Sequence, residues 1–136
     1  IIIISFLIVF YLFLLKVLSH KKTYDNNKKL LQDDIDRKKQ EIDNINNELL
    51  LLSDKAKEYS QEEFYTQLND LFRRYFLYIH ISNADKKTLT ELQKEDIDSK
   101  LLDIFSTSYM FEFSTKQDSL SERKQIIMNF MLYLRK

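Results

Sequence analysis

The side chains that could carry out chemistry are few and widely separated along this chain. It contains no Cys, which excludes thiolate nucleophiles and Cys-ligated metals. The carboxylates of Asp33, Asp34 and Asp36 are close enough in sequence to suggest a metal site. On a helix, however, Asp34 diverges from Asp36, and the Glu-x-x-His pattern of helical metal sites is absent. We therefore interpret the three residues as a solvated acidic face and predict no metal site.

The two histidines offer no catalytic constellation either. His20 follows the apolar N-terminal segment and His80 comes near the end of a predicted helix, so neither has a partner that the sequence can nominate for a Ser-His-carboxylate arrangement. The chain also contains no Gly, although phosphate-binding loops, dinucleotide-binding fingerprints and nucleophile elbows all require it. We predict that the protein is not an enzyme and binds no cofactor.

An adjacent basic pair, Arg73 and Arg74, lies among aromatic residues of a predicted helix. Arginine beside aromatic rings can indicate RNA binding, but the 21 Lys and Arg residues are balanced by 21 Asp and Glu residues. No net charge therefore favours a polyanion, and a single basic pair on a solvated face is ordinary. We predict no nucleic-acid binding and take Arg73 and Arg74 as the candidate surface for a protein partner.

The elements that would position these residues begin with a hydrophobic segment at residues 1–19. As a helix, its first 18 residues span roughly 27 Å, close to the thickness of the hydrocarbon core of a bilayer. A signal peptide or a buried core helix are the alternatives, but a signal peptide would have basic residues first and small residues at a cleavage site. We predict a transmembrane helix that contacts membrane lipids. Because the chain opens within the apolar run and without Met, we expect further residues to precede Ile1.

Basic residues follow this segment directly and predict its orientation. An excess of Lys and Arg marks the cytoplasmic flank of a transmembrane helix. The predicted membrane-interface residues are Lys16, His20, Lys21 and Lys22. We therefore expect a single-pass protein of the cytoplasmic (inner) membrane, with its C-terminal part in the cytoplasm.

Residues 20–59 form a polar segment with one apolar stripe. Its spacing alternates between three and four residues, which is typical of a coiled-coil seam or of an amphipathic helix packed on a neighbour. Lys28 and Lys38 fall within the stripe and weaken it. We predict a long helical stalk and leave its self-association open. The stripe consists of Leu31, Ile35, Ile42, Ile45, Leu49, Leu52, Ala56 and Tyr59.

Residues 60–136 contain three capping boxes, at Ser60–Glu63, Thr88–Glu91 and Ser119–Glu122, each of which predicts the start of a helix. A further helix is expected from about Asp96 to Phe105. The alternation in residues 107–113 suits a strand, but an isolated strand would have no partner, so we predict a helix end and loop there. The face expected to organise the core comprises Phe64, Leu68, Leu71, Phe72, Tyr75, Phe76 and Ile79. The sequence thus predicts an all-α fold with a small C-terminal helical bundle.

The pattern of residues 60–136 resembles the C-terminal cytoplasmic domain of Bat aerotolerance-type bacterial membrane proteins and their single-pass relatives, which are associated with MoxR-type ATPases. A transmembrane helix before this domain fits the same resemblance. The segments that carry it are Glu63–Leu68, Phe72–Phe76, Thr88–Leu92, Leu101–Phe105, Tyr109–Phe113 and Arg123–Phe130.

The resemblance implies an accessory or adaptor role, in which a cytoplasmic helical domain works with a MoxR-type AAA+ ATPase and with proteins that contain a von Willebrand A domain. We therefore expect a membrane-anchored, non-enzymatic adaptor whose helical domain binds a protein partner. The alternative is a structural coiled-coil membrane protein that acts through self-association of the stalk.

Overall fold

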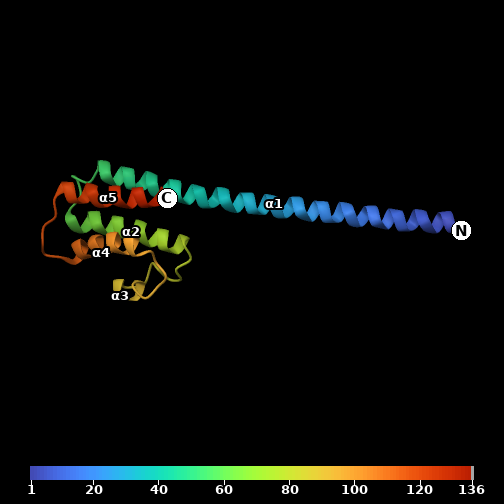
Figure 1. Ribbon diagram of the computed structural model, residues 1–136. Helices are drawn as coiled ribbons and strands as arrows, with labels where there is room; N and C mark the ends of the chain where they lie inside the picture. Colours follow the sequence, from blue (N-terminus) through green and yellow to red (C-terminus); the bar gives the residue numbers. More distant parts are fainter. Residues whose placement is uncertain (136) are drawn as a thin grey trace. The chain divides into compact units, whose positions relative to one another are not determined.

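The computed structural model describes residues 1–135, which form helices and connecting turns with no strand among them (Figure 1). The predicted all-α fold is confirmed. The chain divides into two compact units, an N-terminal unit of residues 1–39 and a C-terminal unit that starts at Gln40. The helices are α1 (Ile2–Asp54), α2 (Gln61–Tyr78), α3 (Leu89–Leu92), α4 (Ser99–Phe113) and α5 (Leu120–Leu134).

The N-terminal unit consists of the first part of α1, and nearly all of its side chains are exposed. Its charged residues pair with one another along the helix. The carboxylate of Asp34 accepts from Arg37 at 3.2 Å and lies 3.3 Å from the Lys38 ammonium group. Exposed pairs of this spacing stabilise a helix by only a few tenths of a kcal/mol each. Residues 20–39 of α1 therefore form an exposed, charged stretch of helix.

The C-terminal unit begins twenty residues earlier than the predicted boundary between Tyr59 and Ser60. The apolar stripe of α1 explains the difference, because Ile45 and Leu49 are completely buried in one core together with residues of α2, α4 and α5. A stripe of this period must cover an apolar neighbour, but its spacing does not say which neighbour. Here the neighbour is the bundle of the same chain, so the last turns of α1 are a bundle helix and not a free stalk.

Aromatic rings fill the centre of this core. Phe72 of α2 is fully buried and stacks on Phe130 of α5, with ring centroids 4.0 Å apart. Phe105 of α4 lies 5.4 Å from Phe72 and 5.2 Å from Phe76. Offset or edge-on contacts at these distances add to the stabilisation from burial alone. The predicted core face of α2 is therefore the face that joins α4 and α5.

The helix α4 extends to Phe113, so the prediction of a helix end and loop within residues 107–113 is wrong. Phe105, Tyr109 and Phe113 recur every fourth residue, and consecutive rings are in contact at 5.8 and 4.9 Å. Phe111 lies on another face and stacks on Tyr65 at 5.2 Å. Two helical faces of aromatic residues, interleaved in sequence, thus produced an apparent alternation.

The predicted capping residues begin three of the helices. At the start of α2, the Glu63 amide donates to Ser60 Oγ at 3.2 Å and the Ser60 amide donates to Glu63 Oε2 at 3.0 Å. Thr88 and Ser119 cap α3 and α5 through bonds from the amides three residues further on. These side chains satisfy amides that have no partner within the helix. Helix starts were therefore predictable from local sequence.

The end of α2 is closed by a left-handed residue although the chain has no Gly. The amide of Ile81 donates to the Phe76 carbonyl and the amide of His80 to the Leu77 carbonyl, both at 3.0 Å. These two bonds define a Schellman motif, and His80 occupies its left-handed position with φ 70°. Asn83 in the next turn has φ 56°. A side chain with a Cβ is strained in this region, and Asn less so than His.

Replacing His80 with Gly should relieve this strain. We expect His80→Gly to raise the free energy of unfolding by about 0.5 to 1 kcal/mol, since the removed strain exceeds the extra entropy of Gly in the unfolded chain. Urea unfolding of the full chain in detergent micelles, followed by near-UV circular dichroism, measures the change. Asn83→Gly is the matched control and should gain less. A loss of stability in His80→Gly would contradict the strain argument.

Candidate partner surface and membrane interface

The apolar N-terminal segment is fully exposed in the structure. Of the described helices, α1 alone contains a stretch long and apolar enough to cross a bilayer, and none of that stretch is buried against protein. Within the described residues, the segment is therefore not a buried core helix. The predicted interface residues are all exposed and follow the apolar stretch along the same helix; they are Lys16, His20, Lys21 and Lys22. A helix of this character can span a membrane with a basic flank on its C-terminal side.

Arg73 is occupied by contacts within the chain. Its Nη1 donates to the carbonyl oxygens of Ala84 at 2.7 Å and Lys87 at 2.5 Å. Its guanidinium also lies over the ring of Phe105, 5.6 Å from the centroid. These contacts hold the segment between α2 and α3 against the core. Arg73, which was predicted to contact a partner, therefore has a structural role within the chain. The sequence alone could not reveal the carbonyls that it binds.

Arg74 bridges two helices instead of standing on a free solvated face. Its Nη1 donates to Glu48 at 2.6 Å and its Nη2 to Glu41 at 3.2 Å, both on α1. The hydrogen bonds that Arg74 donates to these carboxylates, the one to Glu48 foremost, raise the pKa of Arg74. The side chain remains about a third exposed. Arg74 faces α1 because residues from Gln40 onward belong to the bundle, which the predicted boundary did not anticipate.

A surface groove of about 470 Å³ lies beside Arg74 between α1 and α2. Leu51 provides an exposed apolar side chain in its lining, with 59% of its surface accessible. Lys55 and Asp70 add charges of both signs. An apolar side chain surrounded by compensated charges is typical of the rim and core of a protein contact. This α1–α2 groove is the surface hollow that Arg74, one of the predicted partner residues, helps to line.

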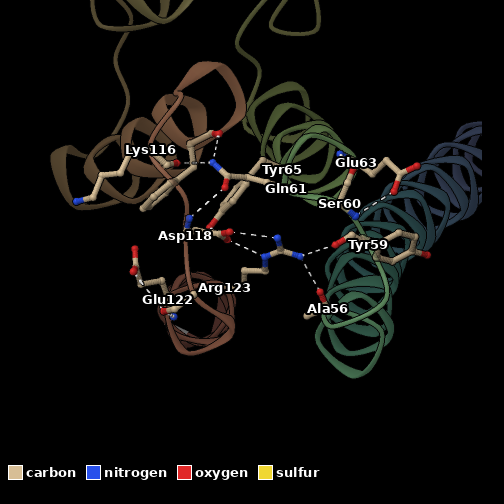
Figure 2. Close-up of polar contacts among 12 residues, drawn as sticks. Ala56, Tyr59, Ser60, Gln61, Glu63, Tyr65, Lys116, Asp118, Glu122 and Arg123 are labelled. Atoms are coloured by element: carbon tan, nitrogen blue, oxygen red, sulfur yellow. Dashed lines mark hydrogen bonds and ion pairs between the residues drawn. The ribbon is translucent and has the colours of Figure 1, made fainter.

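A buried ion pair, which the sequence analysis missed, fastens the bundle at the other end of α2 (Figure 2). Arg123 of α5 binds both carboxylate oxygens of Asp118, through Nε at 2.6 Å and Nη2 at 3.1 Å. Its Nη1 donates to the carbonyl oxygens of Ala56 at 2.7 Å and Tyr59 at 2.8 Å. The side chains of Arg123 and Asp118 are only 12% and 3% exposed. The pair is fully hydrogen-bonded, as a buried pair must be to be stable.

The same carboxylate is held from α2. Tyr65 donates its hydroxyl to Asp118 at 2.8 Å, and Gln61 accepts from the Asp118 amide at 3.0 Å (Figure 2). Burial alone would raise the pKa of Asp118, but the hydrogen bonds from Arg123 and Tyr65 outweigh it and hold that pKa below its usual range. Burial, with the hydrogen bond to Asp118, raises the pKa of Tyr65. Both groups therefore keep their ordinary charge states at neutral pH, which suits a structural role.

A second polar cluster, also missed, joins α2 to α4 inside the core. Ser108 donates to Asn69 Oδ1 at 2.6 Å, and Asn69 Nδ2 donates to Glu112 at 2.5 Å. The histidines make no side-chain hydrogen bond within residues 1–135, so Ser108 has no imidazole to activate it. No buried side-chain polar atom in this part of the chain lacks a partner. The hydrogen bonds among Asn69, Ser108 and Glu112 therefore account for these polar side chains without a ligand.

Of the three acidic residues considered as metal ligands, Asp34 and Asp36 form separate contacts with neighbouring side chains of α1. Asp34 pairs with Arg37 and Lys38, and Asp36 accepts from Gln32 at 3.0 Å. Within the described residues, no three His, Asp or Glu side chains are grouped so that they could hold a metal ion.

Comparison of the chain with protein-family models, with curated proteins and with solved structures finds no match. The resemblance to Bat aerotolerance-type proteins accordingly stays a prediction that the residues alone carry.

The ion pair between Arg123 and Asp118 should make the free energy of unfolding depend on pH. The folded pKa of Asp118 is depressed, so its contribution is present above the unfolded pKa of about 3.9 and is lost as pH falls through the folded value. We expect Asp118→Asn to cost roughly 3 to 5 kcal/mol at pH 7, because Arg123 is left buried without its anion. The mutant should also lose part of the acid dependence. Chemical unfolding between pH 7 and pH 3 measures both effects.

Asp34→Asn is the control, because it removes a carboxylate from exposed pairs and should change stability by no more than about 0.5 kcal/mol. A small loss in Asp118→Asn, or an acid dependence unchanged from the parent chain, would show that the pair contributes little.

Proposed function

We propose that this protein is a membrane-anchored, non-enzymatic adaptor, in which residues 1–19 insert into the lipid and the C-terminal unit binds a protein partner. One observation carries the proposal. The single helix α1 contains both the exposed apolar stretch and the fully buried core residues Ile45 and Leu49. The helix that contains the apolar stretch therefore also contributes core residues to the C-terminal unit. Such a connection suits a domain that is displayed at a membrane.

The alternative function, a structural coiled coil, has few residues left for self-association, because most of the apolar stripe is used elsewhere. From Ile42 to Tyr59 the apolar stripe packs into the core of the C-terminal unit. Only Leu31 and Ile35 of the stripe remain exposed on the N-terminal unit. A stable coiled coil needs about three to four heptads of apolar residues. Self-association through residues 24–39 alone would be weak, which favours the adaptor.

The resemblance supplies the class of partner and the location in this proposal. It implies a MoxR-type AAA+ ATPase or a protein with a von Willebrand A domain, acting at the bacterial inner membrane. The exposed basic residues from Lys16 to Lys22 support a cytoplasmic C-terminal unit, since basic flanks are retained on that side.

The orientation can be tested by proteolysis of sealed vesicles. Protease added to sealed right-side-out bacterial membrane vesicles should leave residues 20–136 intact, because the basic flank keeps them inside. Immunoblotting of the C-terminal unit gives the readout. Vesicles opened with detergent are the control, in which the unit should be cut. Digestion in sealed vesicles would reverse the proposed orientation.

Partner binding at the α1–α2 groove can be tested by site-specific photocrosslinking in native membranes. A photoreactive residue at position 51, where Leu51 is exposed, should crosslink a protein partner, and Arg74→Ala should reduce that product severalfold. Arg74→Ala should cost no more than about 1 kcal/mol of stability, because its ion pairs are partly exposed.

Two controls separate binding from folding. A photoreactive residue at Met110, which is exposed on α4, should give little product. Phe72→Ala should lose crosslinking and about 3 to 5 kcal/mol of stability together, since it empties the aromatic core. Equal products from positions 51 and 110, or an undiminished product in Arg74→Ala, would move the partner surface away from this groove.

A further inference from the structure

A second groove, between α1 and α5, has a different character. It encloses about 390 Å³, and its wall is formed by Leu50 and Ser53 of α1 and by a series of residues along α5. Three of its apolar side chains are strongly exposed, namely Leu50 at 49%, Met128 at 55% and Leu132 at 52%. Ile127 is almost completely buried and forms part of the core beneath the groove. Solvent-facing apolar side chains gathered on a concave surface are typical of an interaction site.

The α5 side of the groove has a regular order. Lys124, Met128, Leu132 and Arg135 follow one another at steps of four, four and three residues, which places them in one row along the helix. The two cations are therefore at opposite ends of the row, about 16 Å apart along the axis, and the apolar side chains lie between them.

The charge of this α1–α5 groove is uncompensated. Its lining includes Lys124 and Arg135 but no carboxylate, and neither cation forms an ion pair within residues 1–135. In the α1–α2 groove, by contrast, Arg74 is paired with Glu41 and Glu48. A ligand that brings carboxylates to both ends of the row would supply the missing anions.

We propose that the α1–α5 groove binds an amphipathic helix of a partner protein, whose apolar stripe is bounded by two acidic residues about three helical turns apart. The inference rests on the proposed adaptor function and specifies the feature that the adaptor recognises. An apolar helix face in a groove is a common mode of peptide recognition, and exposed Met side chains adapt well to such ligands.

Two other occupants fit the groove less well. A second copy of this chain that docked symmetrically through the same groove would bring Lys124 and Arg135 of both copies together, and like charges in a contact are unfavourable. A bilayer surface is flat, whereas the apolar side chains here line a hollow between two helices. The ridge of side chains on a helix matches such a hollow.

The test uses the full chain in nanodiscs of neutral lipid and two designed helical peptides of about 18 residues. Both peptides carry the same Leu stripe, and they differ only in having Glu or Lys at the two flanking positions. Fluorescence anisotropy should show the Glu peptide binding about tenfold more tightly than the Lys peptide, as expected for two favourable charge pairs. The double variant Lys124→Glu/Arg135→Glu should reverse this preference.

A further pair of variants tests the apolar part of the site. Met128→Ser should weaken binding of the Glu peptide severalfold, while Met110→Ser on α4 should leave it unchanged, since both residues are exposed Met but only Met128 lines the groove. Thermal midpoints that match the parent chain establish that each variant is folded.

Several results would overturn the proposal. These are equal affinities for the two peptides, a preference that survives the charge reversal, or equal effects of Met128→Ser and Met110→Ser. Recruitment of anionic vesicles that depends on Met128 would assign the groove to a lipid surface, and a dimer abolished by Met128→Ser would assign it to a second copy. Failure of peptide binding with Arg74-dependent crosslinking intact would remove this site alone. Peptide selectivity without any crosslinked partner would instead count against the proposed function.

Discussion

The guanidinium of Arg123 joins parts of the C-terminal unit that are far apart in sequence. It binds the carboxylate of Asp118 just before α5 and the carbonyls of Ala56 and Tyr59 after α1, while Tyr65 of α2 holds the same carboxylate (Figure 2). The carbonyls of Ala56 and Tyr59 belong to the segment in which α1 ends and the chain turns toward α2. Three segments therefore meet at one buried cation, and removal of its anion would leave a charge that is largely shielded from water.

This junction lies just beyond the end of α1, whose last turns divide between the core and the surface. Within the run Leu49–Leu52, Leu49 and Leu52 enter the core while Leu50 and Leu51 remain exposed. Helical geometry requires such a division, because four consecutive residues cannot share one face. Leu49 and Leu52 hold α1 in the bundle, whereas Leu50 and Leu51 line the α1–α5 and α1–α2 grooves, respectively. Packing and recognition thus use different faces of the same helix.

Local signals in the sequence were sufficient for part of this structure. Ser60, Thr88 and Ser119 predicted three helix starts correctly, because a cap is formed by residues within one turn. The destination of the α1 stripe was not predictable, since periodicity identifies an apolar face without naming its neighbour. Arg73 and Arg74 were selected as a pair, yet long-range contacts with a loop and with α1 gave them different roles. Asn69 and Ser108 escaped notice because their bond joins residues that only the fold brings together.

The two grooves beside α1 differ in the charge that they present. In the α1–α2 groove the cation Arg74 is paired with Glu41 and Glu48, so charge favours no particular ligand there, and a partner would be held mainly by contact with the side chains of Arg74 and Leu51. In the α1–α5 groove Lys124 and Arg135 form no ion pair within residues 1–135 and flank apolar side chains, so charge and apolar burial favour the same ligand. Charge complementarity contributes more to specificity and association rate than to affinity. An adaptor with both surfaces would therefore discriminate among partners chiefly at α5, and the α1–α2 groove would add contact area.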